Sequence, residues 1–261
     1  MLKNKKLFLL DMDGTIYLDN NLFDGTIDFL TQVKANNARY VFLTNNSSKS
    51  TEAYVAKLNK IGIAAAKDDF LTSTDATIDF LNQNYKDTCF YCVGTQSFVD
   101  ELVACGVKVA LELCEGIGGV ILSNDQELTF KKLEDVCLLL KNDIPYIATN
   151  PDWVCPTAFG YVPDCGSFAE MISRATGKMP KFIGKPNPEM IYLALEKYGI
   201  DKDDAVMIGD RVYTDIAAGY NAGIDTVLVL SGESTLKDAT NTDTPPTYIL
   251  ENIKVLYAKI K

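Results

Sequence analysis

The sequence LFLLDMDGT, residues 7–15, decides the fold that we expect for this chain. Four apolar residues end abruptly in charge, which is typical of a short buried strand that reaches the edge of a sheet. Two carboxylates, Asp11 and Asp13, follow the strand, and Gly14 allows the chain to turn sharply. Ligands of open α/β sheets bind beyond the carboxyl ends of the strands, so the pair is a candidate catalytic site. A strand that simply ends in an Asx turn would have the same pattern.

Strand-like and helix-like segments alternate along the chain, which predicts an α/β fold with a largely parallel sheet and helices on its faces. Toward the two ends of the chain, strands are expected at residues 7–10, 39–44, 205–208 and 225–230. Helices are expected at residues 25–35, 50–61, 188–198 and 213–221. Residues 238–246 are rich in Thr, Asp and Pro and predict an exposed loop.

The middle of the chain has a different composition, which predicts an inserted domain. All seven cysteines lie between Cys89 and Cys165, and further strands are expected at residues 89–93, 107–111, 119–122 and 145–149. We therefore predict a discontinuous core domain, residues 1–73 and 180–261, and an inserted α/β domain, residues 74–179. The cysteines are expected to be unpaired, as in a reducing cytosol.

The overall composition narrows the function. Lys and Arg number 25 against 35 Asp and Glu, a net charge of −10, which opposes binding to nucleic-acid phosphates. The chain has no histidine, which excludes Ser-His-Asp triads, Cys-His pairs and histidine-ligated zinc. No apolar stretch approaches the roughly 18 residues that span a bilayer, and Asp11 cuts short the first apolar run, so no signal peptide is expected. We expect a cytoplasmic protein that binds neither nucleic acid nor membrane. A homo-oligomer is compatible with the sequence, but no feature decides it.

Polar residues follow other expected strands as well. Thr44 closes the second strand, just before a helix whose first N–H groups favour anions. Lys185 follows the short apolar pair Phe182-Ile183, and both Asp210 and Asp215 follow the strand at 205–208. If these strands are neighbours in one parallel sheet, all the polar groups converge at one edge.

This set of side chains suits one kind of chemistry. Carboxylates without histidine or cysteine are ligands for a hard cation, and Mg²⁺ prefers one or two carboxylates together with water and phosphate oxygens. A lysine, a hydroxyl and backbone N–H groups suit the remaining phosphoryl oxygens. An aspartate can act as the nucleophile of phosphoryl transfer through an aspartyl-phosphate.

The motifs resemble, in order, the four motifs of the haloacid dehalogenase (HAD) superfamily of phosphatases: Asp11-Met12-Asp13-Gly14-Thr15, Thr44-Asn45, Lys185-Pro186 and Gly209-Asp210-x4-Asp215. The insertion is similar to the α/β cap of the C2 type in that superfamily. Further pieces resemble the NagD-like, 4-nitrophenylphosphatase branch: Thr44-Asn45-Asn46-Ser47-Ser48, Ala148-Thr149-Asn150-Pro151-Asp152, Gly184-Lys185-Pro186 and Gly209-Asp210-Arg211-x2-Thr214-Asp215-Ile216. The resemblance implies a Rossmann-like core with an inserted C2-type cap.

The resemblance also implies roles for the carboxylates. Asp11 would attack phosphorus and become phosphorylated, while Asp13 would protonate the leaving oxygen and then deprotonate the attacking water. Mg²⁺ would be held by the Asp11 carboxylate, the Asp13 backbone carbonyl and Asp210. Asp215 would orient a metal-bound water or the loop instead of binding directly, although its place is also that of an ordinary residue near a helix N-terminus.

The remaining residues would bind the substrate. Thr44, the backbone N–H of Asn45, and Lys185 would hold the phosphoryl group. Asn150 and Asp152 in the inserted domain are candidate substrate contacts, although Asn-Pro-Asp is also simply a turn.

The aspartate at position 13 decides the reaction class that the resemblance implies. It favours phosphate-ester hydrolysis over C–Cl or C–P cleavage, with small phosphorylated metabolites as substrates: nucleoside monophosphates, sugar phosphates and 4-nitrophenyl phosphate. Two alternatives stay open: a phosphotransferase or mutase acting on sugar phosphates, and a non-catalytic sensor of a phosphorylated ligand.

Overall fold

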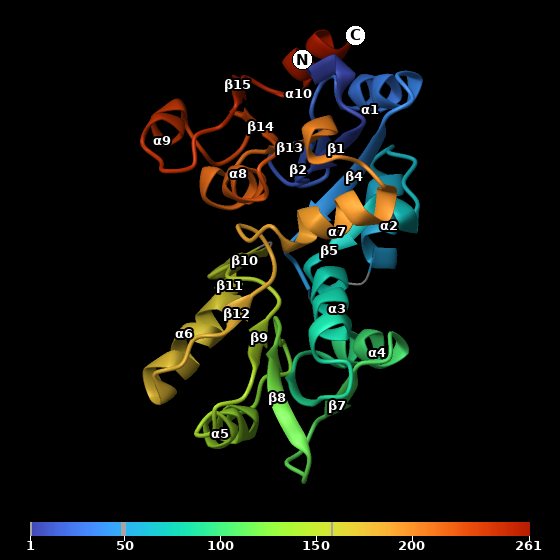
Figure 1. Ribbon diagram of the computed structural model, residues 1–261. Helices are drawn as coiled ribbons and strands as arrows, with labels where there is room; N and C mark the ends of the chain where they lie inside the picture. The colour runs from blue at the N-terminus through green and yellow to red at the C-terminus, as the bar shows by residue number, and fades with distance from the viewer. Residues whose placement is uncertain (1, 48–50, 158) are drawn as a thin grey trace. The chain divides into compact units, whose positions relative to one another are not determined.

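The computed structural model describes residues 2–47, 51–157 and 159–261 (Figure 1). The chain folds into two compact units. The first contains Met1–Thr44, Thr51–Leu71 and Lys185–Lys261, and the second contains Asn45–Ser50 and Thr72–Gly184. The second unit thus takes in a short segment directly after Thr44. Ser48 and the expected helix start at Ser50 lie outside the described residues.

The first unit is built on a six-stranded sheet in the order β15-β14-β13-β1-β4-β5. The strands are β1 (Leu7–Leu10), β4 (Arg39–Thr44), β5 (Phe70–Thr72), β13 (Ala205–Gly209), β14 (Asp225–Val229) and β15 (Tyr248–Leu250). All neighbours from β15 to β4 pair in parallel, which confirms the predicted parallel sheet. Because β1 lies in the middle, its last residues are flanked by the ends of β4 and β13.

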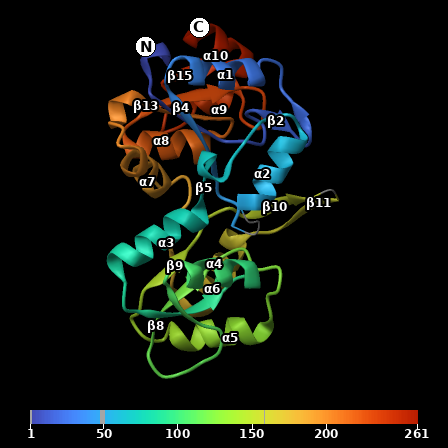
Figure 2. The ribbon, with the colours of Figure 1, turned by 90° about the vertical axis from the view of Figure 1, so that its right-hand side faces the viewer.

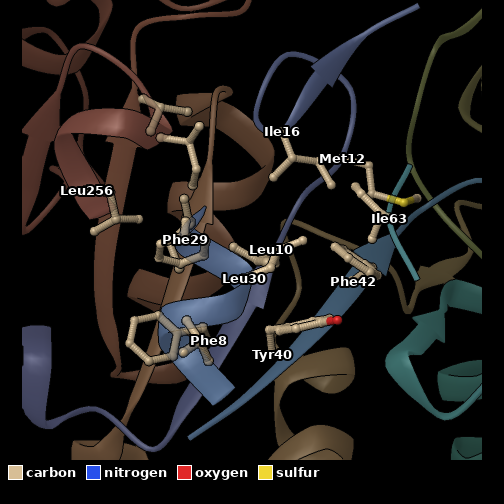
Figure 3. Packing of buried hydrophobic residues seen from close by; sticks show 14 of the residues in the cluster. Phe8, Leu10, Met12, Ile16, Phe29, Leu30, Tyr40, Phe42, Ile63 and Leu256 are labelled. Atoms are coloured by element: carbon tan, nitrogen blue, oxygen red, sulfur yellow. The ribbon is translucent and has the colours of Figure 1, made fainter. Parts of the chain in front are cut away.

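Two sets of helices cover this sheet. One face packs against α1 (Thr26–Ala35), α2 (Thr51–Lys60) and α10 (Ile253–Ile260). Figure 3 shows Leu10 of β1 between Phe29 of α1 and Phe42 of β4, and the Phe8 ring packs against Phe29 with ring centroids 5.7 Å apart. Alternation along the strands turns Leu7 and Leu9 to the opposite face. There α8 (Ala217–Ala222) packs on the sheet so closely that a Cβ on Gly219 would lie 2.4 Å from Thr226.

The second unit has its own five-stranded parallel sheet, in the order β12-β9-β8-β6-β7. Its strands are β6 (Cys89–Val93), β7 (Lys108–Ala110), β8 (Ile117–Leu122), β9 (Tyr146–Ala148) and β12 (Lys181–Phe182). Its helices are α3 (Ser73–Asn84), α4 (Gln96–Ala104), α5 (Phe130–Leu139) and α6 (Cys165–Thr176) (Figure 2). No cysteine in the described part of the chain forms a disulfide, as predicted.

Several expected boundaries shift. The helix expected at 213–221 begins as a π-helical turn, Val212–Ile216, before α8, and the helix expected at 188–198 is α7 (Glu189–Tyr198). The loop expected at 238–246 is wrong at its start, where Thr235 and Asp238 form a capping box that opens α9 (Leu236–Thr240). Two small hairpins were not expected: β2 (Tyr17–Leu18) with β3 (Asn21–Leu22), and β10 (Val154–Thr157) with β11 (Gly160–Pro163). Short helical turns cover Leu2–Asn4, Lys67–Asp69 and Lys202–Asp204.

The strand before Lys185 is not where the sequence places it. We expected Phe182-Ile183 to be a strand of the same sheet as β1, but β12 pairs with β9 in the second unit. A run of two apolar residues does not specify its partner, and Ile147 and Ala148 offer a buried edge in that sheet. Lys185 therefore enters the first unit from a link between the units and does not follow one of its strands.

None of the helices in the described part of the chain combines the length and the hydropathy that a membrane span requires.

Candidate active site

The central strand delivers Asp11 to the carboxyl edge of the first sheet. Leu10 pairs with Phe42 on one side and with Ile208 on the other, and the Asp11 N–H donates to the Ile208 carbonyl at 2.9 Å. The residues that follow these three strands therefore share one edge. Asp11, the end of β4 and Asp210 meet there, as the sequence predicts.

Lys185 is the centre of charge in this cluster. Its Nζ donates to Asp11 Oδ1 at 2.6 Å, to Asp215 Oδ1 at 2.7 Å and to the Leu43 carbonyl at 3.3 Å. The Lys185 side chain is only 4% exposed, and Asp215 is 1% exposed. Burial disfavours the ammonium form of Lys185, but the two carboxylates outweigh this effect and raise its pKa. Lys185 is therefore a fixed cation that holds Asp11 in one orientation.

Asp210 is buried beside this ion pair and is incompletely satisfied. Its Oδ2 accepts the Glu233 N–H at 2.7 Å, whereas its buried Oδ1 has no hydrogen-bond partner within the described part of the chain. A Cβ on Gly232 would lie 2.0 Å from Asp210 Oδ2, and one on Gly14 would lie 2.5 Å from the same atom. The two glycines make room for this carboxylate.

The arrangement of the acids fits a divalent cation. Asp11, Asp210 and Asp215 each offer a carboxylate oxygen, and these oxygens lie within 4.8 Å of one another. Both oxygens of Asp215 are engaged, one by Lys185 and the other by the Arg211 N–H at 3.1 Å. The buried Oδ1 of Asp210 has no such partner among the described residues. Hard oxygen donors of this kind suit Mg²⁺ or Ca²⁺.

Crowding of these acids changes their protonation. Burial, followed by the charge of Asp215, raises the pKa of Asp11 to about 8, although Lys185 opposes the shift. Burial and the charge of Asp215 also raise the pKa of Asp210 to about 6. The side chain of Asp11 keeps 19% of its surface exposed, so the nearby solvent moderates this effect. A bound cation would favour the charged forms of both groups.

Asp13 lies in a different environment from Asp11, although only one residue, Met12, separates them in the sequence. Its side chain is 55% exposed. The Tyr17 hydroxyl donates to Asp13 Oδ2 at 3.2 Å, and Lys57 Nζ lies 3.8 Å from Asp13 Oδ1. Burial and the charge of Asp13 raise the pKa of Tyr17, so the phenol keeps its proton. The contacts of Tyr17 and Lys57 with Asp13 could not be predicted from the sequence, because no motif or periodicity joins these residues to Asp13.

One boundary between the two units falls between the consecutive residues Thr44 and Asn45. Thr44 is the buried last residue of β4 in the first unit, whereas Asn45 belongs to the second unit. The Asn45 carbonyl accepts from Ser73 Oγ at 2.7 Å and from Asn150 Nδ2 at 2.9 Å. Asn45 Nδ2 donates to Asp152 Oδ1 at 3.2 Å. The structure thus brings Asn150 and Asp152, both predicted, together with Asn45.

A buried hydroxyl cluster holds the same segment. Ser123 Oγ donates to Ser47 Oγ at 2.8 Å, and Ser47 Oγ lies 3.1 Å from Thr149 Oγ1. Gly184 completes the packing, because a Cβ there would lie 2.6 Å from Asn45 Oδ1 and 2.8 Å from the Thr149 carbonyl. Serine and threonine at strand ends carry no distinctive spacing, so the sequence did not reveal this cluster.

Comparison with known proteins agrees with this geometry. Residues 8–108 match the haloacid dehalogenase-like hydrolase family, and residues 182–256 match a HAD-hydrolase-like family. The chain is 33% identical over 260 residues to the acid sugar phosphatase of Staphylococcus aureus strain MRSA252, covering 100% of both proteins. It superposes on the crystal structure of 4-nitrophenylphosphatase from Thermotoga maritima with a TM-score of 0.92 and 38% identity, covering 100% of this chain and 99% of that one. For glycerol phosphate phosphatase from Mycobacterium tuberculosis in complex with magnesium, the TM-score is 0.90 at 27% identity, with 98% of this chain and 78% of that chain covered.

The chain therefore belongs to the haloacid dehalogenase-like hydrolases. Within that family it is a phosphomonoester hydrolase of the branch that contains the NagD-like proteins and the 4-nitrophenylphosphatases.

Proposed function

We propose that this chain hydrolyses phosphate monoesters of small metabolites in two displacements at Asp11. In the first, the Asp11 carboxylate forms a bond to phosphorus while the bond from phosphorus to the alcohol oxygen breaks, and Asp13 gives that oxygen a proton. In the second, Asp13 takes a proton from water, the water oxygen bonds to phosphorus, and the bond to Asp11 breaks. The enzyme returns to its starting state, and inorganic phosphate leaves.

The contact that carries this proposal is Lys185 between Asp11 and Asp215. Because Lys185 Nζ binds Asp11 Oδ1, it fixes the carboxylate in one rotamer with Oδ2 directed elsewhere. A nucleophile held in this way loses little further freedom when the ester arrives. The ammonium group also offsets the repulsion between Asp11 and an anionic phosphoryl group.

We assign the cation as Mg²⁺, bound by the Asp11 carboxylate, the Asp13 backbone carbonyl and Asp210. The unpartnered buried oxygen of Asp210 supports this assignment. When bound, the ion would neutralise charge on the phosphoryl oxygens during transfer. Asp215 would not bind the cation directly, since its oxygens already accept from Lys185 Nζ and from the Arg211 N–H.

The phosphoryl oxygens would be bound by Lys185, the Thr44 hydroxyl and the Asn45 N–H group. We propose that the second unit is the C2-type cap that selects the substrate. Asp152, which is half-buried, stays a candidate substrate contact. The fully buried Asn150 would act by holding the Asn45 carbonyl.

For the substrate we propose sugar phosphates, polyol phosphates and nucleoside monophosphates. The relatives named as acid sugar phosphatase and glycerol phosphate phosphatase support the first two classes. The relatives named as 4-nitrophenylphosphatases support that synthetic ester as a practical assay.

The test is phosphate release by the purified chain with Mg²⁺, from 4-nitrophenyl phosphate and from a panel of phosphorylated metabolites. Asp11→Asn should abolish release while far-UV circular dichroism stays unchanged. Asp225→Asn is the control, because Asp225 begins β14 at the opposite end of the sheet and pairs with Lys5. Wild-type turnover in Asp11→Asn would refute the assignment of Asp11 as the nucleophile. Metabolite binding without turnover in the wild type would indicate a sensor.

A further inference from the structure

The turn after Asp13 brings a buried tyrosine back beside it. Thr15 N–H and Ile16 N–H both donate to the Met12 carbonyl, at 3.2 and 3.0 Å. The Gly14 N–H then donates to the Tyr17 carbonyl at 2.8 Å. Gly14 has a φ of +81°, a conformation that residues with a Cβ rarely adopt. The loop therefore closes on itself within five residues.

Tyr17 is fixed from several sides. Its side chain is 0% exposed, and its backbone is held in the hairpin of β2 and β3, where it pairs with Leu22. The preceding carbonyl, of Ile16, accepts from Thr26 Oγ1 at 2.9 Å. A tyrosine with so little freedom directs its hydroxyl to one place, which is Asp13 Oδ2.

Lys57 of α2 contacts both partners. Its Nζ lies 4.0 Å from the centre of the Tyr17 ring and 3.8 Å from Asp13 Oδ1. An ion pair at a half-exposed carboxylate contributes little to stability. Lys57 therefore acts mainly through its position: it lies beside Asp13 Oδ1, whereas Tyr17 binds Asp13 Oδ2.

We propose that Tyr17, assisted by Lys57, is a positioning residue that holds the Asp13 carboxyl group in the orientation needed for proton transfer to the leaving oxygen. This inference rests on the proposed role of Asp13 as the acid. Proton transfer needs heavy atoms within about 3 Å, and a half-exposed aspartate without these contacts would spend much of its time in other rotamers. Tyr17 itself neither gives nor takes a proton.

The test compares two esters whose leaving groups differ in their need for a proton. Glycerol phosphate releases an alkoxide that must be protonated, whereas 4-nitrophenyl phosphate releases a stable phenolate. Tyr17→Phe removes only the hydroxyl. We expect kcat/KM for glycerol phosphate, which reports the transfer to Asp11 and not the later hydrolysis of the aspartyl-phosphate, to fall about 10-fold, a part of the 100-fold or more that general acids supply. We expect kcat/KM for 4-nitrophenyl phosphate to fall less than about 2-fold.

The matched control is Tyr91→Phe. Tyr91 is also a buried tyrosine whose hydroxyl donates to an aspartate, Asp135, at 3.0 Å, but it lies in the β6 strand of the second unit. Its loss should leave the ratio of the two kcat/KM values as in the wild type. A purely structural effect of Tyr17→Phe would lower both rates together, since both depend equally on the folded fraction.

Lys57→Met gives a second and independent variant, on a helix surface, if Tyr17→Phe does not fold. We expect the same selective loss with glycerol phosphate, smaller in size. Asp13→Asn distinguishes the role of Asp13 as the acid from the positioning role of Tyr17 and Lys57. If Asp13→Asn lacks the selective loss, the acid assignment fails. If Asp13→Asn shows it and both positioning variants keep the wild-type ratio, the present inference alone is overturned.

Discussion

Lys185 shows at the scale of one residue how an ion pair can support the fold and, in the proposed mechanism, also the reaction. It is almost fully buried and is held by two carboxylates on residues 174 and 30 positions away in the sequence. Buried charges are tolerated only when they are paired. The pairing also assigns separate tasks to the acids, because Asp11 and Asp215 share the lysine while Asp210 does not.

Lys185→Met should therefore lower both stability and activity. Removing one partner of a buried ion pair costs about 3–5 kcal/mol, and here two carboxylates would be left facing each other. We expect the urea midpoint to fall clearly and phosphate release to be lost. Adding Asp215→Asn should restore part of the stability but not the activity. If Lys185→Met alone were as stable as the wild type, the buried ion pairs of Lys185 would not stabilise the fold as proposed.

Gly232→Ala tests the room around Asp210. The added Cβ would lie 2.0 Å from Asp210 Oδ2, so the carboxylate must move. We expect the Mg²⁺ concentration for half-maximal activity to rise at least about 10-fold, or about 1.4 kcal/mol. Gly118→Ala in β8, whose Cβ would meet only the Thr88 methyl group at 3.0 Å, is the control. An unchanged Mg²⁺ requirement would argue against Asp210 as a ligand.

The sequence predicted the acids better than their supports. Asp11, Asp210 and Asp215 follow apolar strands, and strand ends of one parallel sheet must meet, so their convergence could be foreseen. Tyr17 and Lys57 lie on a hairpin and a helix whose approach to Asp13 depends on tertiary packing. No local pattern encodes that packing, and the same holds for Ser47 and Ser123.

At the scale of elements, the segment after β4 is the clearest case of a strand end serving two units. Thr44 closes a strand of the first sheet, and the next residue is hydrogen-bonded within the second unit. The sequence placed both residues in one domain because a loop of polar residues has no periodicity that could assign it.

Asn150→Ala should destabilise the second unit. Asn150 is 0% exposed and donates to the Asn45 carbonyl, so its loss leaves a buried acceptor with one donor fewer, at a cost of about 1–3 kcal/mol. Trp153, the single tryptophan, lies in this unit and reports its unfolding by fluorescence. Asn142→Ala is the control, because Asn142 is exposed and, among the described residues, its side-chain amide donates only to the nearby Leu139 carbonyl. Equal midpoints for the two variants would contradict the structural role of Asn150.

The strands of four or more residues in the two large sheets were predicted closely, whereas the four-residue hairpin strands β10 and β11 were missed. The apolar runs of β1, β4 and β6 were found with their exact bounds. The two-residue strand β12 was assigned to the wrong sheet, because so few residues carry no register information. Helix α9 was missed because its capping box lies in a stretch rich in turn-forming residues, which dominated the prediction.

At the scale of the whole molecule, the acids of the site link folding stability to pH and to the cation. Folded Asp11 and Asp210 have pKa values of about 8 and about 6, above the usual 3.8. The folded state therefore binds protons more tightly than the unfolded state does. Without a divalent cation, these groups make the protein more stable as the pH falls from about 8 toward about 4.

We expect this effect to be visible in thermal unfolding with a chelator present. From about pH 8 to about pH 5, the wild-type midpoint should rise relative to that of Asp210→Asn, which lacks one raised carboxyl group and relieves the other. Added Mg²⁺ should raise the wild-type midpoint most at the upper end of this range, because protons compete with the cation. Parallel curves for the two proteins at all pH values would contradict the prediction.

The cysteine thiols allow one of the two units to be labelled selectively. Every thiol belongs to the second unit, and two of them, Cys105 and Cys114, are exposed. A maleimide dye or spin label added to the native protein would therefore mark that unit alone and leave the unit that carries Asp11 without a label. One half of the chain can be followed spectroscopically while the other half does its chemistry, with no need to engineer a cysteine-free background first.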